Sequence, residues 1–140
     1  MIVVDTNVIS ELTRQAPAPK VAAWLDSLPV DEVATTAITA AELHYGVERL
    51  ADGRRKTELS AAVHGLLSDD FQDRILAFDE PAAGRYAEIV SHRERLGRPI
   101  GVADAQIAAI CRAIGATLAT RNTDDFGETG IELINPWKLP

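Results

Sequence analysis

The fold is decided by the first twelve residues, MIVVDTNVISEL (1–12), in which a short apolar run stops at polar side chains. The run from Ile2 to Val4 is β-branched and is typical of a buried strand. The tripeptide from Asp5 to Asn7 consists of residue types that cap the start of a helix. The stretch therefore predicts a strand that passes directly into a helix, with the Asp5 carboxylate at the junction.

The same alternation continues along the chain. Further short strands are predicted over 33–35, 75–78, 117–120 and 131–134, and amphipathic helices over 19–28, 39–50, 55–67, 79–97 and 103–114. Short apolar strands that alternate with amphipathic helices favour an α/β fold with a parallel sheet of four to five strands, flanked by α-helices on both faces. The 140 residues contain no internal repeat or linker, so we expect a single domain over residues 1–140.

Composition restricts the compartment and the class of partner. The single cysteine, Cys111, leaves no disulfide framework and no cysteine-based metal cluster, which favours a reducing, cytoplasmic compartment. No apolar run approaches the roughly 20 residues that a membrane span needs, so neither export nor a membrane partner is indicated. The 14 Lys and Arg against 21 Asp and Glu give a net charge of −7, which by itself opposes avid, nonspecific binding of nucleic acid.

Acidic and polar side chains are expected to gather at one edge of the sheet, because ligands bind beyond the carboxyl ends of parallel strands. The candidates are Asp5 after the first strand, Asp104 in the first turn of a helix, and Asn122, Asp124 and Asp125 after the strand that ends at Thr120. Glu42 is a further candidate, because it lies about 90° from the centre of the apolar stripe of its helix, on the shoulder of the buried face. Gly46, one turn later, leaves room beside it.

Several carboxylates in one pocket raise one another's pKa and resist joint ionisation. A bound Mg²⁺ or Mn²⁺ removes that repulsion, and these hard cations prefer oxygen ligands. Such a cluster suits metal-assisted hydrolysis of a phosphodiester. The cation also turns an acidic cleft into a local phosphate site, which answers the objection raised by the net charge.

Each acid also has a simpler explanation when it is taken alone. Asp5 fits a helix cap, Asp104 a first-turn acid that answers the helix dipole, and Glu42 a solvated residue. Asp124 and Asp125 fit a turn. The three histidines have no ligand spacing, and no glycine-rich phosphate loop follows the first strand. Spacing alone leaves metal chemistry and these structural roles both open.

Four separated blocks, in order, resemble the PIN-domain toxins of the VapC type. The blocks are MIVVDTNVISEL (1–12), TAAELHYGVERL (39–50), GRPIGVADAQIAAI (97–110) and LATRNTDDF (118–126), the last followed by LINPW (133–137). The FitB-like and plasmid-stability members are the most similar, and the match extends from Met1 to about Trp137. The resemblance implies a Mg²⁺- or Mn²⁺-dependent endoribonuclease. It implies the toxin of a type II toxin–antitoxin pair, with RNA as substrate and a DNA-binding, VapB-like antitoxin as partner. A homodimer that assembles further with the antitoxin is also implied.

The resemblance assigns roles to individual residues. It implies Asp5 and Asp104 as direct metal ligands, and Glu42 as a ligand, direct or through water, that helps to orient the nucleophile. Many PIN domains carry a fourth acid where this chain has Asn122, so Asp125 is the expected substitute and Asp124 the weaker one.

Residues around the acids are expected to support them. Asn7, Thr120 and Asn122 are candidates to hold the carboxylates by hydrogen bonds. Arg98 and Arg121 flank the acidic blocks and are the candidates for contacts with RNA phosphates. The run from Arg54 to Lys56 is interpreted as an ordinary charged helix start.

Two other functions stay open. A haloacid-dehalogenase-like phosphohydrolase also has an aspartate after its first strand, but its chemistry needs a second acid two residues later, where this chain has Asn7. A noncatalytic binding module would use the same acidic cleft to receive the basic residues of a partner.

Overall fold

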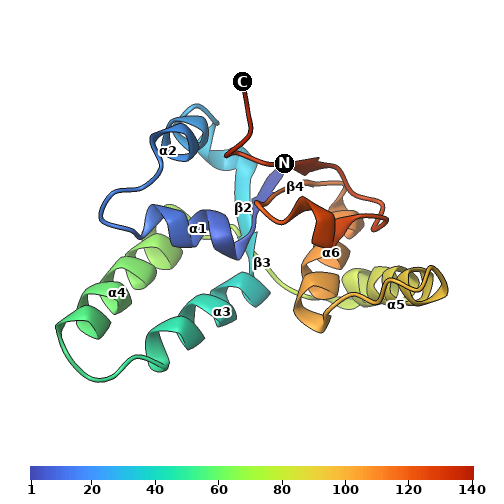
Figure 1. Ribbon diagram of the computed structural model, residues 1–140, viewed down its shortest axis with the longest axis horizontal. Coiled ribbons are helices and arrows are strands. Elements are labelled where there is room, and N and C mark those ends of the chain that lie inside the picture. The colour runs from blue at the N-terminus through green and yellow to red at the C-terminus, as the bar shows by residue number, and fades with distance from the viewer.

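Five short strands, all parallel, form the centre of the computed structural model, which describes residues 1–140 (Figure 1). In chain order they are β1 (Ile2–Val4), β2 (Val33–Thr36), β3 (Ile75–Leu76), β4 (Thr117–Ala119) and β5 (Leu133–Ile134). Their order across the sheet is β3-β2-β1-β4-β5, so β1 lies in the middle. The predicted parallel sheet of four to five strands is confirmed.

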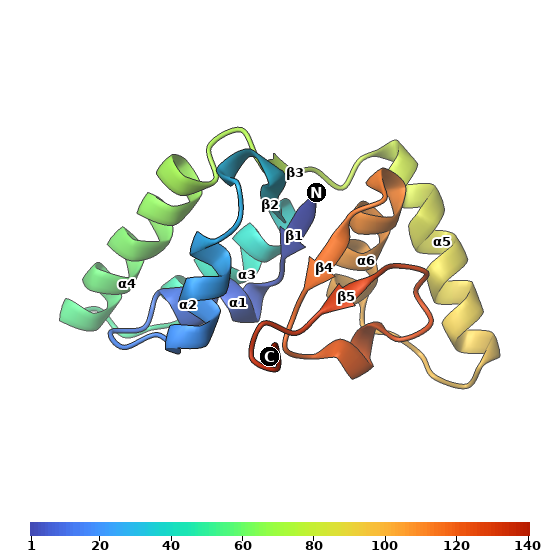
Figure 2. The same ribbon diagram turned by 90° about the horizontal axis from the view of Figure 1, so that it is seen from above.

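Helices cover both faces of the sheet, as predicted. They are α1 (Thr6–Leu12), α2 (Pro19–Asp26), α3 (Ala37–Glu48), α4 (Arg54–Gly65), α5 (Glu80–Arg95) and α6 (Val102–Ile114). Figures 1 and 2 show α1 to α4 on one side of the sheet and α5 and α6 on the other. Three shorter helical segments are η1 (Val30–Glu32), η2 (Leu66–Asp70) and η3 (Thr123–Phe126). None of the helices has the length and the apolar character that crossing a membrane requires.

The two faces of the sheet bury two separate hydrophobic cores. Side chains alternate between the faces along a strand, so Val3 joins the core against α5 and α6, while Val4 joins the core against α1 to α4. Leu118 and Ala119 divide between the same two cores. The β-branched run of β1 is therefore buried from both sides.

The two edge strands are shorter than predicted. β3 pairs only with β2, through Thr35 with Ile75 and Thr36 with Leu76. β2 ends at Thr36 because α3 starts at the next residue, so β3 has no partner beyond Leu76. β5 is likewise confined to the two positions that pair with β4.

Side chains at the strand ends start the next helices without a loop. Asp5 caps α1 by accepting a hydrogen bond from its first backbone N–H. The Thr36 hydroxyl accepts a hydrogen bond from the Thr39 N–H at 3.1 Å, so α3 begins at Ala37 rather than at the predicted Thr39. These short connections keep both helix starts at the carboxyl edge of the sheet.

The chain reverses its direction across the sheet at β1. It first moves to β2 and β3 on one side, and later to β4 and β5 on the other. In an open parallel sheet, such a switch point separates the segments that follow the two central strands and leaves a crevice between them. Asp5 follows β1 at this point, and the segment 120–122 follows β4.

We expect the core on the α6 side to control stability. Ile107 is 1% exposed, whereas Ile114, on the same helix, is 50% exposed. Because Ile107→Ala leaves a cavity, it should lower the free energy of unfolding by about 2–5 kcal/mol. Ile114→Ala is the matched control and should change it by about 0.5 kcal/mol or less. Urea denaturation of both variants measures the difference, and equal losses would contradict the assigned core.

Candidate active site

A cleft of about 600 Å³ opens at the carboxyl ends of β1 and β4. Its lining includes three of the predicted acids, Asp5, Glu42 and Asp104, which come from the end of β1, from α3 and from α6. Three elements that are distant in the sequence thus bring their carboxylates to one cavity. The cleft is polar, because only four of its 17 lining residues are hydrophobic.

Asp5 is the most buried of these acids, with 5% of its surface exposed. Its Oδ1 accepts a hydrogen bond from the Thr6 N–H at 2.8 Å, and its Oδ2 accepts one from the Thr120 hydroxyl at 2.7 Å. The Asn7 amide also donates to Oδ2, at 3.4 Å. Burial raises the pKa of Asp5 more than these hydrogen bonds lower it, and the charges of Glu42 and Asp125 raise it further.

Glu42 reaches the cleft from the first half of α3. Its neighbour Leu43 is buried whereas Glu42 itself is exposed, which agrees with its predicted place at the edge of the apolar stripe. Its Oε1 accepts a hydrogen bond from the Thr6 hydroxyl at 2.8 Å. Gly46 also lines the cleft, and a side chain there would meet no atom within 4 Å, so the space beside Glu42 is open.

Asp104 lies in the first turn of α6 and is half-buried. Loss of hydration raises its pKa to about 6, and the negative charges of Asp5, Asp125 and Glu42 act in the same direction. The positive charge of Arg93 acts in the opposite direction and lowers it. Burial, together with repulsion from the neighbouring acids, therefore favours a protonated Asp104 in mildly acidic solution.

The other polar candidates divide into two groups. Asn122 lines the cleft, and Thr120 is fully buried and accepts hydrogen bonds from the Asn122 N–H and the Asn7 amide. Asp124 and Asp125 are exposed in η3 and do not line the cleft. Asp125 still acts on the site through its charge, because it raises the pKa of both Asp5 and Asp104.

A buried arginine behind the acids was not anticipated from the sequence. Arg93 is 5% exposed, and its guanidinium donates to the carbonyl oxygens of Arg98 (2.6 Å), Asp125 (3.1 Å) and Gly127 (2.9 Å). It has no carboxylate partner within 4 Å. No local pattern separates Arg93 from the exposed Glu94 and Arg95 that follow it.

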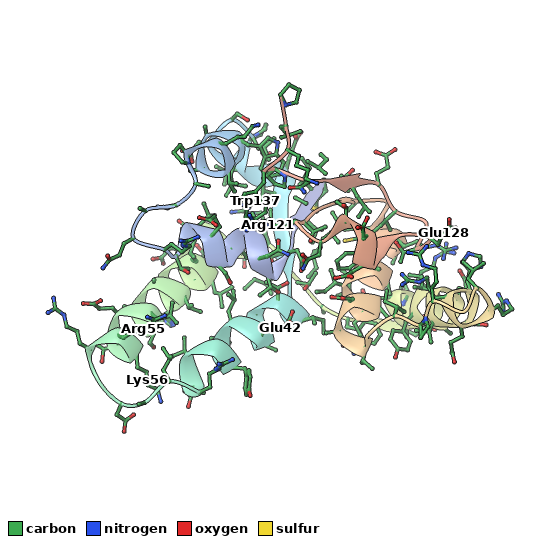
Figure 3. All side chains as sticks on the ribbon, viewed as in Figure 1. Glu42, Arg55, Lys56, Arg121, Glu128 and Trp137 are labelled. Atoms are coloured by element: carbon green, nitrogen blue, oxygen red, sulfur yellow. The ribbon has the colours of Figure 1, made fainter.

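Three arginines line the same cleft: Arg14, Arg55 and Arg121. Figure 3 shows Arg121 above Glu42, and Arg55 on α4 further out. Arg55 lies at a helix start, where the sequence indicated only a solvated charge. Arg98, the other predicted phosphate contact, does not line the cleft, and its guanidinium approaches Gly127 instead.

The side chains of the cleft that could act as metal ligands fit a hard divalent cation better than a soft one. Asp5, Glu42 and Asp104 offer carboxylate oxygens, as does Glu11, which also lines the cleft but is paired with Arg14, and the three histidines of the chain are exposed elsewhere. No three His, Cys, Asp or Glu side chains are close enough together to form a complete ligand set. Mg²⁺ commonly keeps several waters and uses one or two carboxylates together with substrate phosphates, so the arrangement suits this ion.

Cys111 is a packing residue. It is fully buried in the core on the α6 side, and burial raises the pKa of its thiol to about 12. A thiol with so little thiolate at neutral pH is a poor nucleophile and a poor metal ligand.

Fold and site together define a parallel α/β domain with an acidic cleft at the switch point of its sheet, and residues 2–132 match the PIN domain. The chain belongs to the PIN-domain family, within which it resembles the VapC type. Its sequence is 44% identical to Toxin FitB of Neisseria gonorrhoeae, over 98% of this chain and 99% of that protein. It is 39% identical to VapC ribonuclease Y4jK of Sinorhizobium fredii, over 99% of both chains.

A solved structure of FitAB bound to a DNA fragment contains a chain with the same fold. That chain superposes with a TM-score of 0.92 at 43% sequence identity, and the alignment covers 100% of this chain and 98% of that one. The resemblance to the FitB-like members that the sequence motifs indicated is thereby confirmed.

The raised pKa of Asp104 predicts a pH-dependent stability in buffer free of divalent metal. Its pKa of about 6 in the folded chain exceeds the ordinary aspartate pKa of 3.8. The folded chain therefore binds more protons between these values, and its stability falls as the pH rises through this window. Asp104→Asn removes the free-energy cost of a charged carboxylate at this position. It should therefore raise the free energy of unfolding by about 1 kcal/mol at about pH 7.5, a figure reduced for solvent screening.

The difference from wild type should shrink as the pH is lowered toward about 4, where the wild-type carboxyl is also neutral. Urea denaturation in EDTA at both pH values is the measurement. Asp124→Asn is the matched control, because this neighbouring acid is exposed, and it should show no such pH dependence. A gain at low pH as large as at high pH would contradict the assigned burial of Asp104.

Proposed function

We propose that this chain is a metal-dependent endoribonuclease that acts in the cytoplasm as the toxin of a type II toxin–antitoxin pair, its 140 residues forming one PIN domain. The observation that carries the proposal is the convergence of Asp5, Glu42 and Asp104 on one cleft at the switch point of the sheet. The similarity to a toxin and to a VapC ribonuclease supports the substrate class.

The buried acids are the proposed ligands of Mg²⁺ or Mn²⁺. Asp5 is fixed in place, because both of its oxygens accept hydrogen bonds from the chain, and Asp104 faces it from α6. Such an ion lowers the pKa of a bound water and stabilises the charge that develops on the leaving oxygen. The resting repulsion between the acids would be relieved when the ion binds.

Glu42 is proposed to orient the attacking water. It is exposed at the cleft, its carboxylate is held by the Thr6 hydroxyl, and the open space beside Gly46 leaves room for solvent. A carboxylate in this position can accept a proton from the nucleophile as the new P–O bond forms. Thr120 and Asn7 keep the Asp5 carboxylate from rotating while the substrate is bound.

A second groove supports the proposed antitoxin partner. It has a volume of about 530 Å³ and is lined mainly by apolar side chains of α1, α2, η1, η2 and the residues that follow them, including Leu12, Leu25, Leu28 and Phe71. An apolar segment of a VapB-like, DNA-binding antitoxin would bury this surface. The similarity to a chain in a DNA-bound FitAB complex supports this partner. We further propose that the toxin is a homodimer that assembles with the antitoxin.

Removal of either buried acid should abolish RNA cleavage. Asp5→Asn and Asp104→Asn keep the shape of the side chain but remove the charge, so each should lower the cleavage rate of a single-stranded RNA by at least about 100-fold. Gel analysis of a labelled RNA with Mg²⁺ or Mn²⁺ measures the loss, and circular dichroism verifies the fold. Asp124→Asn is the control and should cleave like wild type.

Full activity of both variants would exclude the proposed site. Wild-type protein that cuts no RNA but binds a basic partner would favour the binding module instead. A phosphate ester trapped on Asp5 would favour the haloacid-dehalogenase-like phosphohydrolase.

Glu42→Gln should weaken metal binding without abolishing it. Because Glu42 is exposed and is proposed to act directly or through water, we expect its loss to lower the affinity for Mn²⁺ by about tenfold. Isothermal titration of the full-length protein with MnCl₂ is the measurement. Glu48→Gln, on the same helix but outside the cleft, is the control. Unchanged affinity in Glu42→Gln would return Glu42 to the role of a solvated helix residue.

A further inference from the structure

Arg121 is held against an aromatic ring at the acidic cleft. Its Cζ lies 4.8 Å from the centroid of the Trp137 ring, a distance within the range of a cation–π contact. Both side chains line the cleft that contains Asp5, Glu42 and Asp104. Figure 3 shows the pair together, with Glu42 below.

Hydrogen bonds fix the backbone on both sides of this contact. The Asn135 amide donates to the Arg121 carbonyl at 3.4 Å and accepts from the Trp137 N–H at 3.0 Å, so one side chain links the two residues. The Arg121 N–H donates to the Asn7 Oδ1 at 3.1 Å, and the amide nitrogen of Asn7 donates to Asp5. Arg121 is thus tied to the buried acid through one intermediate residue.

The guanidinium itself has no acceptor in the chain. Arg121 forms no ion pair within 4 Å and donates no side-chain hydrogen bond. Arg14, in the same cleft, is instead paired with Glu11 at 3.3 Å. The N–H donors of Arg121 are therefore available to a ligand, whereas Arg14 shares its charge with a carboxylate.

The Trp137 ring is positioned to support Arg121 rather than to bind a ligand directly. The indole is partly buried and packs against the core on the α1 to α4 side. The Arg121 guanidinium lies over the ring, so the face that it covers is not free to stack on a base.

We propose that Trp137 is a positioning residue that holds the Arg121 guanidinium at the cleft so that it binds a phosphate of single-stranded RNA. This inference deepens the proposed function and rests on it for the substrate class. The planar guanidinium matches the paired oxygens of a phosphate in geometry and donates two parallel N–H hydrogen bonds to them. The ring holds the cation without using those donors.

The test is binding of a fluorescein-labelled, single-stranded 2′-O-methyl oligoribonucleotide in Mg²⁺ buffer, measured by anisotropy at several salt concentrations. Arg121→Gln should weaken binding by about tenfold and lower the slope of log affinity against log salt by about 0.7, the value for one phosphate contact. Trp137→Leu should weaken it by about three- to fivefold, and Trp137→Phe, which keeps an aromatic face, should restore most of the loss.

A double-mutant cycle separates positioning from direct contact. If Trp137 acts through Arg121, the variant with both Arg121→Gln and Trp137→Leu should bind like Arg121→Gln alone. Additive losses would overturn the inference and assign Trp137 to direct stacking on a base. Unchanged binding in Arg121→Gln, or no binding by the wild type, would also overturn it.

Trp24→Leu is the matched control for general loss of packing. Trp24 packs against the same core but does not line the cleft, so its loss should lower the melting temperature without changing the salt slope. An equal loss of binding in Trp24→Leu and Trp137→Leu would assign a purely structural role. Because the probe is not cut, failure of RNA cleavage in a parallel assay with unmodified RNA would refute the proposed function separately from this inference.

Discussion

The structure depends on the Asp5 carboxylate, which is buried at the carboxyl end of the central strand. Asp5 follows the central strand and is 5% exposed, and burial raises its pKa, which the charges of Glu42 and Asp125 raise further. The donors that stabilise it are the Thr6 N–H on its own side of the switch point and the Thr120 hydroxyl on the other. The hydrogen bonds that hold the charge therefore also join the end of β1 to the segment after β4, and the cleft keeps its shape through the same contacts.

Arg93 is a second buried charge that restricts the positions of the acids. A buried cation is costly unless it is hydrogen-bonded and its charge is balanced. Arg93 donates to three carbonyl oxygens instead of to a carboxylate, and its charge lowers the pKa of Asp104. The Arg98 carbonyl belongs to the turn before α6, and the carbonyls of Asp125 and Gly127 lie at the end of η3. Arg93 therefore holds in place both the segment that leads to Asp104 and the segment that carries Asp125. The positive charge of Arg93 therefore offsets part of the repulsion among the acids, and the nearby acids balance the charge of the buried guanidinium.

Local patterns were sufficient to predict the sheet, the helices and the places of three acids. A β-branched run that ends at a capping residue, or a glutamate at the edge of an apolar stripe, is decided by neighbours within one or two helical turns. The metal-ligand role of these acids stays a prediction, because coordination depends on distances that no spacing specifies. Arg93, Arg55 and Trp137 carried no such local pattern. Their surroundings are set by tertiary contacts, such as the one between Arg93 and Asp125 across 32 positions.

The distribution of charge in the cleft explains how a chain of net charge −7 can receive a polyanion. The acids line the cleft, where a divalent cation would neutralise them, and the arginines contribute positive charge from other elements. An arginine paired with a carboxylate would add little, because its charge and its donors are already used. Arg121 is not paired with a carboxylate and lies over the ring of Trp137 instead. The ring attracts the guanidinium but leaves its N–H groups unbound. An aromatic support is therefore better suited than an acidic one to a cation that must later bind phosphate.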